Sequence, residues 1–207
     1  MNIIYQGISL SDKESIQSIK NITDKDTNYF MIKCASSLDG NIEKEQNFDE
    51  YISYAELHSI PYGVYYVTNS TDIKQIEKEA DFVFELLKNK KMQFPVYIEQ
   101  VNTDKTKIKE ATDSIVAFCG KAWYNKFYSG FRCTASYLRN NLDFNRLRRY
   151  NFWLVCHSDR PGNPVIPFGM WEHTNKCRVD NTLNMFPESY CIQNYPKTIR
   201  QNNLNGY

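Results

Sequence analysis

The sequence predicts an α/β fold built on a parallel sheet, and three observations favour it. Short apolar runs alternate with amphipathic runs of helical spacing through the first 150 residues. The apolar runs carry few charges, which is typical of parallel strands covered on both faces. After residue 125, short aromatic runs follow one another with little room for long crossover helices. We therefore predict a β/α layered fold that loses its later helices.

Four apolar runs in the first half of the chain are predicted strands. The first is NIIYQGI at residues 2–8, the second is Tyr29–Ala35 and the third is Pro61–Val67. The fourth, FPVYIEQVN at Phe94–Asn102, reads as a buried strand that ends near one charged side chain, Glu99. That carboxylate is a candidate for a catalytic group because functional residues of parallel barrels follow the strands.

Amphipathic runs separate these strands. The run at residues 70–90 shows helical spacing, and Ser70 or Thr71 is expected to cap its first amide groups. Its apolar positions are Ile73, Ile76, Ala80, Val83 and Leu87. Residues 48–59 and 104–122 are predicted to form two further helices, which gives repeated strand, helix, strand units.

The second half of the chain is richer in aromatic residues. It offers short strand candidates at KFYSGF (126–131), NFWLVCH (151–157) and PFGMWEH (167–173), with a predicted helix at FNRLRRY (144–150). Neither an internal repeat nor a Pro/Gly/Ser linker interrupts the sequence. We expect a single domain from residue 1 to 207.

The composition argues against several partner classes. Lys and Arg number 25 against 24 Asp and Glu, so the net charge of +1 favours neither nucleic acid nor an anionic membrane surface. No apolar run approaches the roughly 18 residues of a membrane span, and the N-terminus lacks the pattern of a signal peptide. We expect a protein without membrane insertion and without an export signal in this chain.

Cysteine and histidine spacing gives no sign of a metal site. The six cysteines lie far apart without a C-x-x-C pair, which favours buried free thiols. Of the three histidines, His58 is expected on a helix surface, while His157 and His173 follow predicted strands and could face a groove. We therefore expect neither a metal nor a cofactor.

Several segments, in order and nearly ungapped, resemble the family-25 glycoside hydrolases, which are lysozymes (N-acetylmuramidases) of bacteria and phages. YQGISLS looks like the family's opening G-I-D-V-S, and FPVYIEQV looks like the strand that carries its acidic D-x-E motif. The family's other segments are matched by FDEYISYAELHSIPYGVYYV, EADFVFELL, KFYSGF, LRRYNFWLVCHSD, GMWEHTNKCRVDN and the tail YPKTIRQNNLNGY.

The resemblance implies an irregular TIM-like (β/α)5(β)3 barrel, which agrees with the predicted loss of later helices. It also implies cleavage of the β-1,4 bond between N-acetylmuramic acid and N-acetylglucosamine by a ring of acidic side chains. Glycoside hydrolysis generally needs a protonated carboxyl group beside the leaving oxygen and a second group that stabilises charge at the anomeric carbon.

When the family's acidic positions are aligned with this sequence, most of them fall on residues that are not acidic. The aspartate of G-I-D falls on Ser9, and D-x-E falls on Glu99 and Val101. The last acidic position falls on Pro187 in an ungapped alignment, or on Thr182 if the alignment follows TLNMF. Each replacement lacks a carboxylate, and Val101 cannot hold a proton for transfer.

Two further details of the resemblance remain open. The Gln and Tyr of the family's W-Q-Y correspond to Glu172 and His173, so polar character is kept while its identity changes. A one-residue shift of the fourth strand would place Ile98 and Gln100 on the D-x-E motif and leave no acid there.

Three functional hypotheses follow. The first is a catalytically inactive lysozyme-like domain that binds peptidoglycan, with candidate sugar-binding side chains at Tyr65, Tyr97, Tyr128, Trp153, Trp171 and Glu172. The second is an active muramidase with a relocated carboxylate pair, in which Glu99 works with Glu172, Asp180 or Glu188. The third is a scaffold or interaction module of a phage or bacterial surface assembly, bound to a protein partner. The expected location is extracellular or cell-wall associated, which includes a phage or prophage product.

Overall fold

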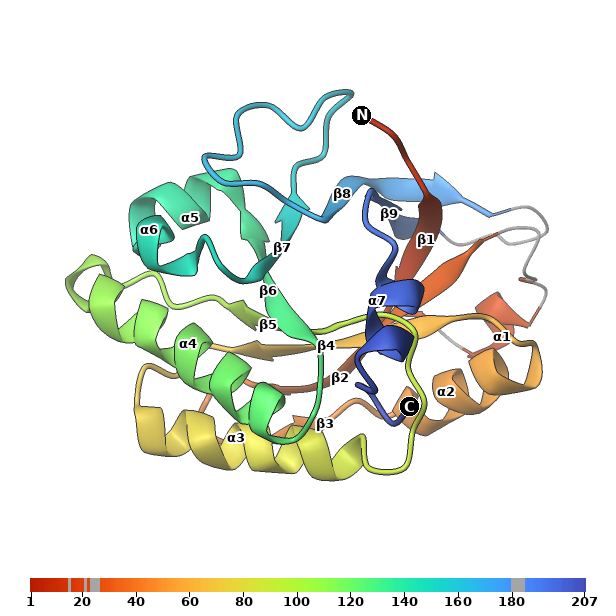
Figure 1. Cartoon of the computed structure of the whole chain (residues 1–207), viewed down its shortest axis with the longest axis horizontal. Coiled ribbons are helices and arrows are strands. Elements are labelled where there is room, and N and C mark those ends of the chain that lie inside the picture. Colours follow the sequence, from red (N-terminus) through yellow and green to blue (C-terminus); the bar gives the residue numbers. More distant parts are fainter. Residues whose placement is uncertain (15, 21, 23–26, 180–184) are drawn as a thin grey trace.

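The computed structural model describes residues 1–14, 16–20, 22, 27–179 and 185–207, and its centre is a closed eight-stranded barrel (Figure 1). Around the barrel the strand order is β1-β9-β8-β7-β6-β5-β4-β2, and pairing of β1 with β2 closes the ring. A two-residue strand, β3 (Glu43–Lys44), extends the sheet beside β2. The barrel strands are β1 (Tyr5–Leu10), β2 (Tyr29–Ser37), β4 (Tyr62–Thr68), β5 (Val96–Gln100), β6 (Ser129–Thr134), β7 (Asn151–Val155), β8 (Met170–Arg178) and β9 (Met185–Cys191).

Neighbouring strands from β1 through β8 pair in parallel around the barrel, and β9 runs antiparallel to both of its neighbours. The C-terminal ends of the parallel strands therefore meet at one rim, together with the first residues of β9. We call this rim the barrel mouth. In parallel barrels this is the end that carries functional side chains.

Helices follow the first five parallel strands only. Among the described residues, β7, β8 and β9 succeed one another without an intervening helix. The helices are α1 (Ile16–Ile19), α2 (Phe48–Leu57), α3 (Ile73–Leu86), α4 (Ile108–Tyr124), α5 (Ala135–Asn141), α6 (Phe144–Leu147) and α7 (Tyr195–Gln201), with a 3-10 turn at Lys105–Lys107. This arrangement confirms the predicted (β/α)5(β)3 barrel.

The sequence pattern missed five short elements, α1, β3, α5, β9 and α7, and one cap. The strand β9 has a proline and a glutamate at its centre, and α5 and α7 span seven residues each, too few for a clear helical period. The expected cap of α3 at Ser70 or Thr71 is wrong. Asp72 holds that position, and its carboxylate accepts a hydrogen bond from the Lys74 amide at 3.0 Å.

Apolar side chains pack on both sides of the barrel wall. The outer layer lies between the strands and helices such as α2, α3 and α4, which run along the outside of the barrel (Figure 1). The inner layer fills the barrel and includes Tyr29, Tyr97 and Trp153. From α7, Tyr195 and Ile199 join this inner layer, and the Tyr195 hydroxyl lies 3.1 Å from that of Tyr97. The helix α7 therefore closes the end of the barrel opposite the mouth.

Within the described ranges, no helix combines the length and the apolar character needed to cross a bilayer.

Candidate functional site

An arginine on β6 binds two carboxylates at the barrel mouth. Arg132 Nη2 lies 2.7 Å from Glu172 Oε2 on β8, and Arg132 Nη1 binds Glu99 Oε2 on β5. All three side chains are largely buried: that of Arg132 is 13% exposed, that of Glu99 20% and that of Glu172 3%. Two of the acidic residues proposed from the sequence as a carboxylate pair, Glu99 and Glu172, are therefore both bound to one cation.

Strand alternation explains why Arg132 points inward. Successive side chains of a strand face opposite sides of the sheet. Phe131 packs in the outer layer with Phe152 at a ring separation of 4.9 Å, so its neighbour Arg132 faces the interior. On β5, Ile98 is likewise in the outer layer and Glu99 faces inward.

Two aromatic rings form the floor beneath the guanidinium. The Arg132 carbon Cζ lies 4.8 Å from the Trp153 ring centroid and 5.4 Å from that of Tyr65. Cation–π attraction adds to the two ion pairs in holding the charge there. Burial by itself lowers the pKa of Arg132, but attraction to Glu172 and Glu99 outweighs it and raises the pKa above its usual range.

His157 completes the hydrogen bonding of Glu172. Its Nε2 lies 2.9 Å from Glu172 Oε1, so both oxygens of this carboxylate have partners. The His157 side chain is 37% exposed and forms the outer end of this chain of contacts. The expectation that His157 faces the mouth agrees with this geometry.

The positions of the lost acids also lie at or near the mouth. Ser9 is 3% exposed, and its hydroxyl has no hydrogen-bond partner among the described residues. Val101 is half-buried directly after β5, two residues beyond Glu99. Pro187 lies on β9, two residues before Ser189, which accepts a hydrogen bond from Trp153 in the barrel interior. None of these three side chains supplies a carboxylate.

The other alignment of the last acidic position, on Thr182, and the candidate acid Asp180 lie outside the described residues.

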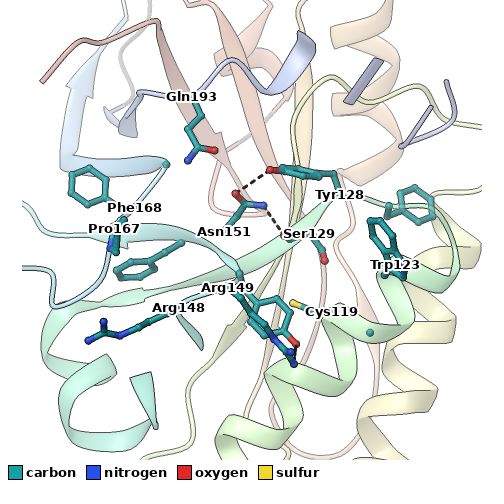
Figure 2. A pocket seen from close by; sticks show the side chains of 15 residues that line it. Cys119, Trp123, Tyr128, Ser129, Arg148, Arg149, Asn151, Pro167, Phe168 and Gln193 are labelled. Carbon is teal, nitrogen blue, oxygen red and sulfur yellow. Dashed lines mark hydrogen bonds between the residues drawn. The ribbon is translucent and has the colours of Figure 1, made fainter. Parts of the chain in front are cut away.

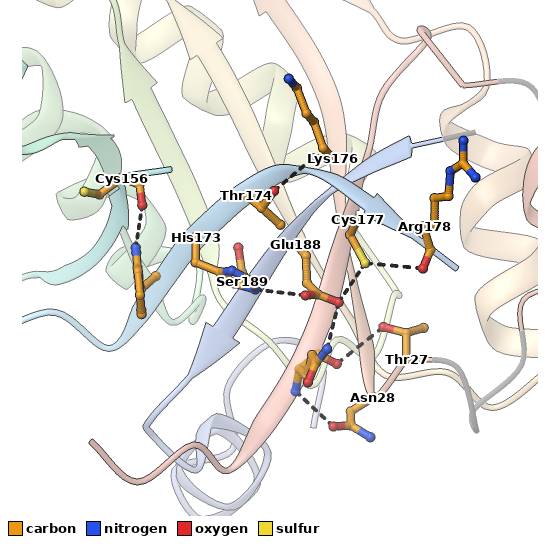
Figure 3. A network of polar contacts seen from close by, with 12 residues as sticks. Thr27, Asn28, Cys156, His173, Thr174, Lys176, Cys177, Arg178, Glu188 and Ser189 are labelled. Carbon is orange, nitrogen blue, oxygen red and sulfur yellow. Dashed lines mark hydrogen bonds and ion pairs between the residues drawn. The ribbon is translucent and has the colours of Figure 1, made fainter. Parts of the chain in front are cut away.

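Glu188 does not join Glu99, although the two were a candidate pair. It alternates with Ser189 and so points away from the barrel interior (Figure 3). There its carboxylate lies 2.8 Å from His173 Nε2 and accepts hydrogen bonds from the Gln6 amide at 2.8 Å and the Cys177 thiol at 3.0 Å. This cluster lies on the outer face of the β8–β9 hairpin.

Two neighbours of Glu188 can be compared with the predictions made from the sequence: His173 lies outside the barrel mouth, and Cys177 is half-buried where a buried thiol was predicted. The sequence left open whether His173 faces a groove, and its ring stacks on Tyr190 at a centroid separation of 4.0 Å on the outer face. Burial, reinforced by the Glu188 carboxylate, raises the pKa of the Cys177 thiol to about 12. We therefore expect the Cys177 thiol to react slowly.

The aromatic residues proposed to stack on sugars do not gather at the mouth. Tyr97 and Trp153 are fully buried, so neither ring has a free face for a ligand. Trp171 is 3% exposed and packs on the outer face, with its Nε1 donating to the Cys156 carbonyl at 2.8 Å. Tyr128 precedes β6 at the opposite end of the barrel. Of the five, Tyr65 and Trp153 lie next to the Arg132 cluster, and Tyr65, at 8% exposed, is the less buried of the two.

The sequence pattern overlooked Arg132, although a signal was present. In SGFRCT, the charge alternates with Phe131 and Cys133, which places it on the inward face of a barrel strand. A charged residue at such a position requires a partner of opposite charge. Within the part of the chain that the structure describes, no three His, Cys, Asp or Glu side chains are arranged to hold a metal ion.

By sequence, the chain matches no protein-family model and no curated protein. By structure, it matches the CTP1L endolysin with a TM-score of 0.79 at 18% identity, covering 96% of this chain and 70% of that one. It also matches GHIP, a glycosyl hydrolase 25 of Streptococcus pneumoniae, with a TM-score of 0.78 at 10% identity over 96% and 92% of the two chains.

A third match is a family 25 glycosyl hydrolase from Bacillus anthracis, with a TM-score of 0.73 at 12% identity over 96% of this chain and 93% of that chain. Sequence identities this low carry information about the fold and not about the chemistry. The chain has the fold of the family-25 glycoside hydrolases.

Proposed function

We propose that this protein is a catalytically inactive lysozyme-like domain that binds bacterial cell-wall peptidoglycan. The observation that carries this proposal is the position of Arg132 between Glu99 and Glu172. Both carboxylates are occupied by ion pairs, and the position expected to hold the proton donor is Val101.

The chemistry of glycoside cleavage supports inactivity. A general acid must carry its proton when the substrate binds, whereas an ion pair with a guanidinium stabilises the ionised carboxylate. Loss of general acid assistance alone lowers a rate by about 10² to 10⁴. Ser9, Val101 and Pro187 remove further charge from the same rim, so little hydrolysis should remain.

The ligand class is suggested by the proteins that share this fold. The modular autolysin LytC of Streptococcus pneumoniae and the Cpl-1 endolysin have been solved with a synthetic peptidoglycan ligand and a peptidoglycan analogue, respectively. A glycan strand laid across the mouth of this barrel would meet Tyr65 and the Arg132 cluster. We infer an extracellular or cell-wall location on the same grounds.

A second candidate function is weak muramidase activity from Glu99 and Glu172. Because both carboxylates contact one guanidinium, their separation lies below the upper limit of roughly 10 Å that glycosidases use. This activity requires Arg132 to leave the pair, since the cation now occupies the space between the two acids.

The experiment combines dye release from labelled, purified peptidoglycan with co-sedimentation on the same material. We expect the protein to sediment with peptidoglycan and to release no dye above a buffer control, while an active lysozyme releases it. If the protein releases dye and the Glu99→Gln variant does not, the protein is an active muramidase and the proposal of inactivity is wrong. Neither release nor sedimentation would contradict glycan binding and favour a scaffold with a protein partner.

A further inference from the structure

A cavity of about 640 Å³ lies near the end of the barrel opposite the mouth. Its walls come from the C-terminal part of α4, the starts of β6 and β7, the turn before β7 and the loop before β8 (Figure 2). Its volume is in the range of cavities that hold small ligands. It shares no lining residue with the Arg132 cluster at the mouth.

The cavity carries uncompensated positive charge. Arg148 and Arg149 both line it, and none of its described lining residues is acidic. Neither arginine forms an ion pair within the described ranges. Arg149 donates to the Tyr150 hydroxyl at 2.9 Å and lies over that ring, and both arginines are exposed. Figure 2 shows the Arg148 and Arg149 side chains pointing to different sides, so an anionic group would find one guanidinium donor at either place, without having to displace a carboxylate.

Aromatic and amide groups complete the lining. The Trp123 side chain is 73% exposed, which is unusual for the largest apolar residue, and Phe168 lies at the opposite end of the cavity in Figure 2. The Asn151 amide lies between them, held by Tyr128 and by the Ser129 carbonyl at 3.0 Å. Those two bonds leave Asn151 one N–H and one lone pair for a ligand.

We propose that this cavity binds an acidic sugar, with one of the two arginines binding its carboxylate, Trp123 its ring face and Asn151 its hydroxyl or amide groups. A ring with an apolar face suits an exposed tryptophan, and fixed amides suit the polar edge of the same ring. The site is separate from the mouth and does not depend on the proposed function there.

The experiment compares three probes by ligand-observed NMR. N-acetylmuramic acid carries both ring and carboxylate, N-acetylglucosamine the ring alone and lactate the acid alone. We expect N-acetylmuramic acid to bind at least tenfold more tightly than either. Tryptophan emission gives a second readout, since Trp123 is exposed while Trp153 and Trp171 are buried.

Matched variants locate the binding site. Arg148→Gln with Arg149→Gln, and separately Trp123→Ala, should each weaken binding of N-acetylmuramic acid at least tenfold. Tyr124→Ala removes the neighbouring exposed ring, which does not line the cavity, and Arg139→Gln removes an exposed charge elsewhere; both should bind as the unmodified protein does. Circular dichroism confirms that each variant folds.

Three results would overturn the proposal. The first is equal affinity for N-acetylmuramic acid and N-acetylglucosamine, which removes the role of the arginines. The second is unchanged binding in the double arginine variant or in Trp123→Ala, which moves the sugar to another site such as the mouth. The third is tighter binding of adenosine monophosphate than of the acidic sugar, which assigns the cavity to a different ligand.

Discussion

Arg132 sets the charge balance of the barrel mouth. Its two ion pairs, its two aromatic neighbours and the contact between Glu172 and His157 form one connected group of mostly buried side chains. A buried ion pair is a weak contribution to stability compared with apolar packing, but removal of one partner leaves a charge that nothing compensates. The arginine is therefore needed as long as the two glutamates remain.

This dependence gives a stability prediction for Arg132→Met. The variant leaves Glu99 and Glu172 without their cation, and the free energy of unfolding should fall by roughly 3 to 5 kcal/mol in urea titrations. Lys88→Met is the control, because its exposed pair with Glu85 contributes about 0 to 1 kcal/mol. Equal effects of the two variants would show that the cluster is not buried in solution.

Cys177 gives a prediction about reactivity. With a pKa of about 12, this thiol at pH 8 should react with iodoacetamide about 10³ to 10⁴ times more slowly than an unfolded cysteine of pKa about 8.5. Only the thiolate reacts, so the rate should rise tenfold with each pH unit while the protein stays folded. Peptide mass spectrometry of labelling in buffer and in urea measures the ratio.

Glu188→Gln supplies the control for Cys177. Removing the carboxylate that accepts the thiol hydrogen lowers the pKa and should accelerate labelling. Labelling of the unmodified protein within tenfold of the unfolded rate would rule out the thiol–carboxylate contact.

At the scale of elements, each strand determines which of its side chains point into the barrel and which point out of it. Alternation along β5 and β6 sends Glu99 and Arg132 inward, while alternation along β9 sends Glu188 outward. The same rule places Glu99 inside the barrel and Glu188 outside it, a difference that their positions in the sequence could not show. The helices act differently: they cover the outside of the barrel, and their ends need caps for their free amide groups.

The cap of α3 allows a direct test at this scale. Asp72→Ala removes the carboxylate that accepts the Lys74 amide, and should cost about 1 kcal/mol of unfolding free energy. Thr71→Ala, at the position expected from the sequence, should change stability by less than about 0.5 kcal/mol. Urea titration of both variants compares them. A larger loss of unfolding free energy in Thr71→Ala than in Asp72→Ala would indicate that Thr71 caps the helix, as the sequence predicts.

At the scale of the whole molecule, closure of the barrel depends on residues from the two ends of the chain. The strand β9 pairs with β1, and α7 brings Tyr195 against Phe94 at the closed end. Their contact joins residues about half the chain apart in sequence. The barrel interior is thereby filled largely by aromatic side chains, and the hydroxyls of Tyr195 and Tyr97 meet there.

Tyr195 is the residue that tests this closure. Tyr195→Ala should cost about 3 to 5 kcal/mol, because the side chain is fully buried and leaves a cavity. Tyr195→Phe removes only the hydroxyl bonded to Tyr97 and should cost about 0.5 to 1.5 kcal/mol. Thermal and urea unfolding measure both losses. Similar losses for the two variants would mean that the ring adds little to the packing.

The local pattern of the sequence determined the strands, the longer helices and the absence of late crossover helices, because periodicity and run length depend on neighbouring residues. It also determined that Ser9 and Val101 cannot act as acids, since that follows from side-chain chemistry alone. The short elements α1, β3, α5, β9 and α7 were not predicted, because elements this short depend mainly on their tertiary neighbours and show little periodicity of their own.

Only the tertiary structure decided which residues meet at the mouth. Glu99 and Glu172 are far apart in the chain and come together because β5 and β8 flank the strands that place Arg132 and Trp153 between them. Burial of Tyr97 and Trp153 was likewise invisible in the sequence, where a core aromatic and a sugar-binding aromatic are the same residue. Charge pairing and burial are properties of three-dimensional neighbours, and those neighbours are set by the closure of the barrel.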